Sequence, residues 1–174
     1  MKGILFGILS AGLLALSGCT ILGQQIQITP VQNIPTNNGV SNPTTPAVKT
    51  SVKLDLSNQQ LTKVPEYVFN MTNLEELNLS NNQLTGAIQS QIGQLKKLKV
   101  LNASNNLMTG VPAEVGQLQN LQVLDLSNNQ LTGLPNELAN LKNLKTFNIS
   151  GNNYSTQDLN TIMKGLPASV NIIK

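Results

Sequence analysis

The chain has 174 residues, of which 11% are charged and 3% aromatic, and its formal net charge is +3. It contains no Arg and no His, and its 11 basic residues are scattered lysines. Scattered lysines without the Arg fork argue against a nucleic-acid partner, and the lack of His argues against His-based catalysis and most zinc sites, so we expect neither a metal nor a cofactor.

Residues 1–18 have the layout of a secretory signal peptide, in which Lys2 precedes an apolar stretch that ends in small residues. The stretch is short for a membrane span, which needs about 20 apolar residues. Its end, Leu16-Ser17-Gly18-Cys19, resembles the bacterial lipobox. The resemblance implies cleavage before Cys19 and lipidation of its thiol and new amine. An ordinary signal peptide and a plain secreted protein are the alternative.

Several acyl chains on Cys19 would anchor the exported protein stably to a bacterial membrane. Thr20 follows the Cys, and the Asp that usually retains lipoproteins at the inner membrane is missing. In a cell with two membranes, lipoprotein sorting patterns then favour the outer one. The expected localisation is therefore lipid-anchored, at the outer membrane or cell surface.

Residues 19–50 combine the lipidated Cys with a predicted disordered tether. From Thr20 to Val48 there is no charged residue, and four Pro are interspersed with many Gln, Asn and Thr. A chain of this length spans roughly 30 Å end to end. The alternative is that the segment belongs to the fold.

Residues 51–174 carry a repeat with a period of 23 or 24 residues. Equivalent apolar positions are Leu54, Leu77, Leu101, Leu124, Phe147 and Val170. The consensus, L-x-x-L-x-L-x-x-N-x-L, resembles that of the leucine-rich-repeat family. The resemblance implies an α/β solenoid, an arc of about five repeats and a truncated sixth, with parallel strands on its concave face.

The ninth repeat position is Asn in all full repeats except the first, which has Gln59. In the family this Asn turns inward and bonds backbone groups at the bend. The resemblance therefore implies a structural ladder of Asn82, Asn106, Asn129 and Asn152. We expect a looser first turn at Gln59. The second repeat has one extra residue within Thr85–Ile88, predicted to bulge on the convex side, and Gln89 replaces the usual Pro.

The last repeat predicts a C-terminal capping helix. Leu159, Ile162, Met163 and Leu166 are spaced for one helical face. Ser155 and Asp158 form a capping-box pattern before them. A sixth, truncated strand is expected at Val170–Ile172. No comparable cap precedes Val52, so the end of the tether or a partner is expected to cover that edge.

The residues that flank the inward Leu pair should form an exposed strand face, which is usually the binding surface in this family. The candidate partner-binding residues are Lys53, Asp55, Glu76, Asn78, Val100, Asn102, Val123, Asp125, Thr146 and Asn148. Val100 and Val123 should be adjacent and exposed, and we predict that they form the contact centre. Two unimportant exposed Val are the alternative, and generic solvated repeats would explain the uniform Asp/Asn, Ser and Asn rows at the fifth, seventh and eighth positions.

No catalytic residues are predicted. Asp55 and Asp125 share a row but lie three strands apart, roughly 14 Å, whereas glycosidase carboxylates need about 5 to 9.5 Å. The predicted function is a monomeric, membrane-anchored lipoprotein that presents the repeats for protein–protein interaction at the cell envelope or surface. A structural or carbohydrate-associated envelope component ranks lower, because sugar binding usually uses aromatic platforms and the strand face offers none.

Overall fold

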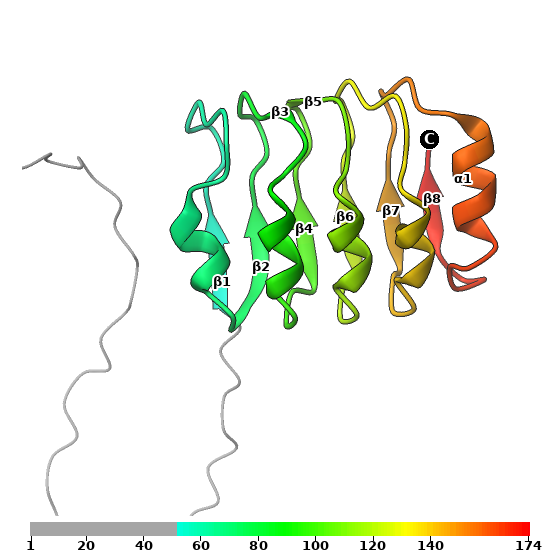
Figure 1. Ribbon diagram of the computed structural model, residues 1–174, viewed down its shortest axis with the longest axis horizontal. Coiled ribbons are helices and arrows are strands. Elements are labelled where there is room, and N and C mark those ends of the chain that lie inside the picture. Colours follow the sequence, from blue (N-terminus) through cyan, green and yellow to red (C-terminus); the bar gives the residue numbers. More distant parts are fainter. Residues whose placement is uncertain (1–51) are drawn as a thin grey trace, which may run out of the picture. The chain divides into compact units, whose positions relative to one another are not determined.

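The computed structural model describes residues 52–174 (Figure 1). The predicted signal peptide (1–18), the lipidation site Cys19 and the tether (19–50) lie outside the described residues. Within residues 52–174, no helix is long and apolar enough to cross a membrane.

Six short strands form one parallel sheet whose order follows the chain, β1-β2-β4-β6-β7-β8. Their bounds are Val52–Asp55 (β1), Leu74–Asn78 (β2), Val100–Asn102 (β4), Val123–Asp125 (β6), Thr146–Asn148 (β7) and Asn171–Ile173 (β8). In β4, β6 and β7 one buried apolar residue lies between two outward-facing, half-buried ones, as the pleat requires. The predicted parallel sheet of five repeats and a truncated sixth is confirmed.

Four single-turn 3-10 helices lie in a second layer against this sheet (Figure 1). Their bounds are Glu66–Asn70 (η1), Ser90–Gln94 (η2), Ala113–Gln117 (η3) and Asn136–Asn140 (η4). Pro65, Pro112 and Pro135 precede three of them with φ between −61° and −72°, which the pyrrolidine ring favours. The repeating Pro therefore fixes where each return segment begins.

The hydrophobic core fills the space between these two layers. Leu74, Leu77 and Leu79 of a single repeat are at most 1% exposed. Burying each such side chain contributes about 1.5–3 kcal/mol. At the first edge of the sheet, by contrast, Val52 is 41% exposed and Leu54 is half-buried. The first repeat thus has no cap among residues 52–174.

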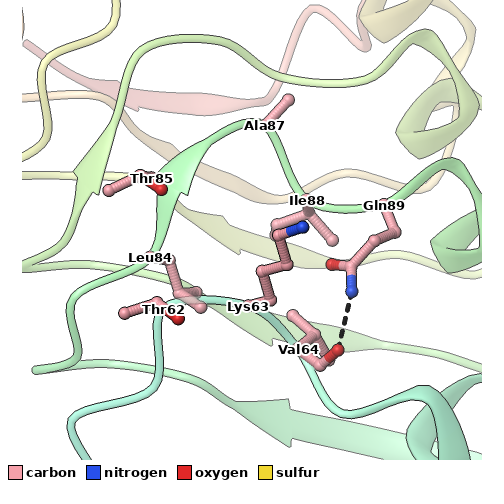
Figure 2. A pocket seen from close by; sticks show the side chains of 8 residues that line it. All are labelled: Thr62, Lys63, Val64, Leu84, Thr85, Ala87, Ile88 and Gln89. Atoms are coloured by element: carbon pink, nitrogen blue, oxygen red, sulfur yellow. Dashed lines mark hydrogen bonds between the residues drawn. The ribbon is translucent and has the colours of Figure 1, made fainter.

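A small additional sheet lies where the second repeat has its extra residue. Thr85–Gly86 (β3) pairs in parallel with Leu107–Met108 (β5) of the next repeat. Gln89 occupies the position of the missing Pro, and its Nε2 donates a 2.7 Å hydrogen bond to the Val64 carbonyl oxygen (Figure 2). The amide thereby ties the second repeat to the first.

Among residues 52–174, one α-helix, α1 (Thr156–Met163), covers the last repeat, as predicted. The Asp158 N–H donates to Ser155 Oγ at 3.4 Å, but only this half of the predicted capping box forms. The Asp158 carboxylate instead accepts the Leu134 N–H of the preceding repeat at 3.3 Å. The prediction for Met163 is wrong, because its side chain is 42% exposed while Leu159 and Ile162 are buried.

The register of β8 differs from the sequence prediction by two residues. Phe147 pairs with Ile172, not with Val170, and the strand covers Asn171–Ile173. An α-helix advances 1.5 Å per residue, whereas extended chain advances about 3.3 Å. Because α1 replaces a mostly extended return segment, more residues are needed before the chain re-enters the sheet.

Candidate functional site

The sheet register collects all ten predicted contact residues into two rows on the strand face, defined here as the outward-facing residues of the six-stranded sheet. The first row is Lys53, Glu76, Val100, Val123 and Thr146. The second row is Asp55, Asn78, Asn102, Asp125 and Asn148. Sequence reasoning therefore placed these residues together correctly.

Two ion pairs lie at the β1 end of the sheet. Lys53 Nζ lies 2.8 Å from Glu76 Oε2, and Lys99 Nζ lies 2.6 Å from Glu75 Oε2. The Lys53 side chain is 62% exposed, so its pair contributes about 0–1 kcal/mol. The pairs mainly neutralise this end of the face.

The two Val at the centre of the first row are less accessible than predicted. Val100 and Val123 are adjacent partners on β4 and β6, but both are half-buried, not exposed. Glu76 on β2 and Thr146 on β7 flank the two Val in the same row. The Val pair is thus a small, partly covered apolar floor.

The Asp and Asn of the second row hold their own backbone turns. In each repeat, Oδ1 of this residue accepts the N–H of the Ser two positions later, and the five distances are 2.9–3.2 Å. Asn148 Nδ2 also donates to Asp125 Oδ2 at 3.1 Å. The hydrogen bond from the Ser57 N–H lowers the pKa of Asp55 below its ordinary 3.8. This row is therefore largely committed to local structure.

The uniform Ser and Asn rows also have structural causes, which the sequence prediction of solvent-facing rows missed. Ser80, Ser104 and Ser127 are only 5–7% exposed. The eighth-position residues have left-handed backbone, with φ between 53° and 59° at the four Asn and 69° at Gly151. Asn and Gly are the residues that tolerate this region best. The repetition at these positions thus reflects the turn.

The predicted Asn ladder is present, and it points backward along the chain. Asn129 Nδ2 donates to Leu126 O of its own repeat at 3.0 Å and to Ala103 O of the preceding repeat at 3.0 Å. Its Oδ1 accepts the Met108 N–H of the preceding repeat at 3.0 Å. Each ladder Asn therefore joins two consecutive bends.

This direction gives Gln59 a different explanation from the looser turn that the sequence suggested. The bend of the first repeat is held by Asn82, whose Oδ1 accepts the N–H groups of Gln59 and Leu61 at 2.9 and 3.0 Å. Within residues 52–174, no repeat precedes the first, so the ninth position has no earlier bend to join. An Asn is not needed there.

One recess opens away from the strand face, where the second repeat carries its extra residue. Thr62, Lys63 and Val64 of the first repeat line one side, and residues 84–89 of the second line the other (Figure 2).

Residues 52–174 contain no cluster of three or more His, Cys, Asp or Glu that could hold a metal ion. The strand face therefore remains the surface to which the predicted residues converge.

Comparison with protein families identifies the repeat. A profile described as "Leucine rich repeat" matches residues 52–108. A profile described as "Leucine Rich repeats (2 copies)" matches residues 96–135 and 119–162. The two together span more than half of the chain.

Solved structures show the same fold. A leucine-rich-repeat protein of Leptospira interrogans is 42% identical, with a TM-score of 0.62, and the match covers 66% of this chain and 29% of that one. A chain in the BIR3–SERK2 complex from Arabidopsis thaliana is 35% identical, with a TM-score of 0.55, covering 60% and 57%. A plant peptide hormone receptor, RGFR1 in complex with RGF2, is 30% identical, with a TM-score of 0.53, covering 63% and 18%. No curated protein matches the chain.

Proposed function

Because this chain belongs to the leucine-rich-repeat family, we propose that its strand face binds a short protein segment and that a lipid on Cys19 anchors it to a bacterial envelope membrane. Two similar structures support the first part, since one is a protein–protein complex and the other a peptide hormone receptor with RGF2. The Leptospira chain of which this sequence spans 29% is considerably longer, so the proposal concerns the repeats alone.

The observation that carries the proposal is the adjacent pair Val100 and Val123. This pair is the apolar part of the strand face. The polar side chains around it are largely engaged in hydrogen bonds to their own turns or in ion pairs. Six strands spaced about 4.8 Å apart give a face roughly 25 Å long. A face of this size suits a short extended or looped segment better than a large globular surface.

A photo-crosslinking residue in place of Thr146, which neighbours Val123 in the first row of the strand face, tests the contact in intact cells. We expect a discrete adduct there and none from the same residue at Asn136 on the helix layer. The variant Val100→Lys/Val123→Lys should abolish the adduct. Its control, Gln94→Lys/Asn140→Lys, adds the same charge at exposed positions of the helix layer and should leave it intact. An adduct that survives the Val substitutions contradicts the proposed contact centre.

The proposed anchor is tested at Cys19. Cys19→Ala should abolish incorporation of labelled palmitate and move the protein out of the detergent phase, whereas Ser17→Ala should leave both unchanged. If the Ala variant fractionates like the natural protein, the lipid anchor is wrong. Protease treatment of intact cells then reports which side of the envelope carries the repeats, and loss of the repeats supports the cell surface.

A further inference from the structure

Four lysines that are scattered in the sequence lie along one edge of the solenoid. They occupy the turns that lead from the helix layer into the next strand: Lys96 and Lys97 before β4, Lys142 before β7 and Lys164 after α1. All four are exposed. Because the strands are parallel, these turns line up at the edge where strands begin, at the bottom of Figure 1. We call these four residues the lysine edge.

Neither of the two ion pairs found among residues 52–174 involves a member of the lysine edge. Lys96 Nζ donates to Gln117 Oε1 at 3.0 Å, and Lys97 Nζ donates to Asn73 Oδ1 at 2.6 Å. Lys142 Nζ donates to backbone carbonyls. All of these acceptors are neutral, so the edge keeps its positive charge.

The acidic residues lie outside the turns of this edge. Glu66, Glu114 and Glu137 stand in the first turns of 3-10 helices. Glu75 and Glu76 on β2 are paired with Lys99 and Lys53. The described turns at residues 71–73, 95–98, 118–121, 141–144 and 164–170 contain no Asp or Glu. The charged side chains in these turns are therefore all positive, although the formal net charge of the whole chain is only +3.

The lysine edge is also the edge at which the described part of the chain begins. β1 starts at Val52, and the N-terminal ends of all strands in a parallel sheet lie on one side. Any segment that leads from Cys19 must join the domain here. A lipid on Cys19 would therefore be connected to the domain at this edge.

We propose that the lysine edge docks on an anionic phospholipid surface. This inference rests on the proposed lipid anchor, which makes docking intramolecular and lets a weak attraction count. A lysine near an anionic bilayer strengthens binding roughly fivefold. One anchor combined with a basic patch is a recognised way to hold a protein on a membrane. Docked in this way, the strands stand upright on the bilayer, and the strand face opens sideways.

A single-Trp reporter tests the docking in the full chain, which has no natural Trp. Thr72→Trp places the reporter on the lysine edge, and Gln83→Trp places it on the opposite edge, both at exposed positions. The protein is reconstituted in vesicles of equal parts phosphatidylcholine and phosphatidylglycerol that include a headgroup-quencher lipid. We expect strong quenching of the reporter at position 72, relieved by high salt, and little at position 83. Vesicles of phosphatidylcholine alone should quench neither.

A matched pair of variants separates location from net charge. Lys97→Gln/Lys164→Gln should lower the docking constant roughly 25-fold, from two lysines at about fivefold each. Lys63→Gln/Lys174→Gln removes the same charge elsewhere and should leave quenching unchanged. Equal quenching of the two reporters, equal loss in the two variants, or quenching in phosphatidylcholine alone overturns the proposal.

Flotation in high salt distinguishes this proposal from the anchor on which it rests. Protein that floats with vesicles in high salt, yet shows no quenching at position 72 in low salt, keeps the anchor and refutes the docking. Protein that fails to float in high salt refutes the anchor. Salt-sensitive quenching at position 72 in that case still supports the lysine edge as the docking surface.

Discussion

The side chain of Asn129 joins two consecutive repeats, so its replacement by Ala tests how the solenoid is held together. Asn129 is 8% exposed and has bonds to the Met108 N–H and to the carbonyls of Ala103 and Leu126. Truncation to Ala leaves the Met108 N–H without this partner inside the bend. The carbonyls of Ala103 and Leu126 each lose one bond but still accept from Asn106 Nδ2 and Asn152 Nδ2.

The magnitude follows from the number of groups affected. A buried polar group left unsatisfied costs about 1–3 kcal/mol. One unsatisfied N–H and two weakened carbonyl bonds give a destabilisation of about 2–3 kcal/mol. The free energy of unfolding of natural domains is about 5–15 kcal/mol, so Asn129→Ala should remove a sizeable part of it.

Equilibrium urea unfolding followed by circular dichroism measures this loss. The matched control is Gln59→Ala, which changes the same repeat position at an exposed site and should cost under about 0.5 kcal/mol. If the two variants lose equal stability, or if Asn129→Ala costs less than about 1 kcal/mol, the ladder does not couple the repeats as argued.

Three further predictions concern single positions. A Cβ at Gly116 would lie 2.2 Å from the Glu137 carbonyl oxygen, so Gly116→Val should cost at least about 2 kcal/mol in thermal unfolding, whereas Gly110→Ala, with open space, should change little. Folding lowers the pKa of Asp55, so the stabilisation by its carboxylate is fully present above the unfolded-state pKa and is lost as pH falls through the folded-state pKa. The difference in stability between the natural protein and Asp55→Asn should therefore shrink below about pH 4. A difference that does not change with pH contradicts this. Ser155→Ala removes the cap of α1 and should cost about 1 kcal/mol in urea unfolding, while Ser155→Asp should retain stability.

The repeat period made the sheet predictable, because inward Leu positions recur whatever the outward residues are. The same logic failed where the period itself changes. The two-residue shift of β8 arises because α1 replaces extended chain, and a count of 23 residues assumes that every return segment is alike. The family resemblance predicted that Asn82 bonds backbone groups at the bend. It did not predict that these bonds reach back to the preceding repeat.

The candidate surface was predictable in position but not in accessibility. Alternation along a strand shows which residues face outward, yet it does not show that Val100 and Val123 are half-buried. The uniform Asn row at the eighth position also suggested only a solvated surface. The left-handed φ at Asn105 shows that the backbone of the turn favours Asn there. The lysine edge was not predictable from the repeat period, because only two of its four members, Lys96 and Lys142, occupy an equivalent repeat position.

The backward direction of the Asn ladder has a consequence for the order in which the protein can mature. The carbonyl of Leu56 waits for Asn82, which follows 26 residues later in the chain. A chain that emerges from a secretion channel with its N-terminus first can therefore never finish a bend until the next repeat has also crossed. Each new repeat locks the one before it, and the last of these bonds come from Asn152 to the bend of the fourth repeat. If the chain is exported as proposed, a chain cut short before Asn152 should therefore keep an unfinished bend in the fourth repeat, which is a natural target for envelope proteases.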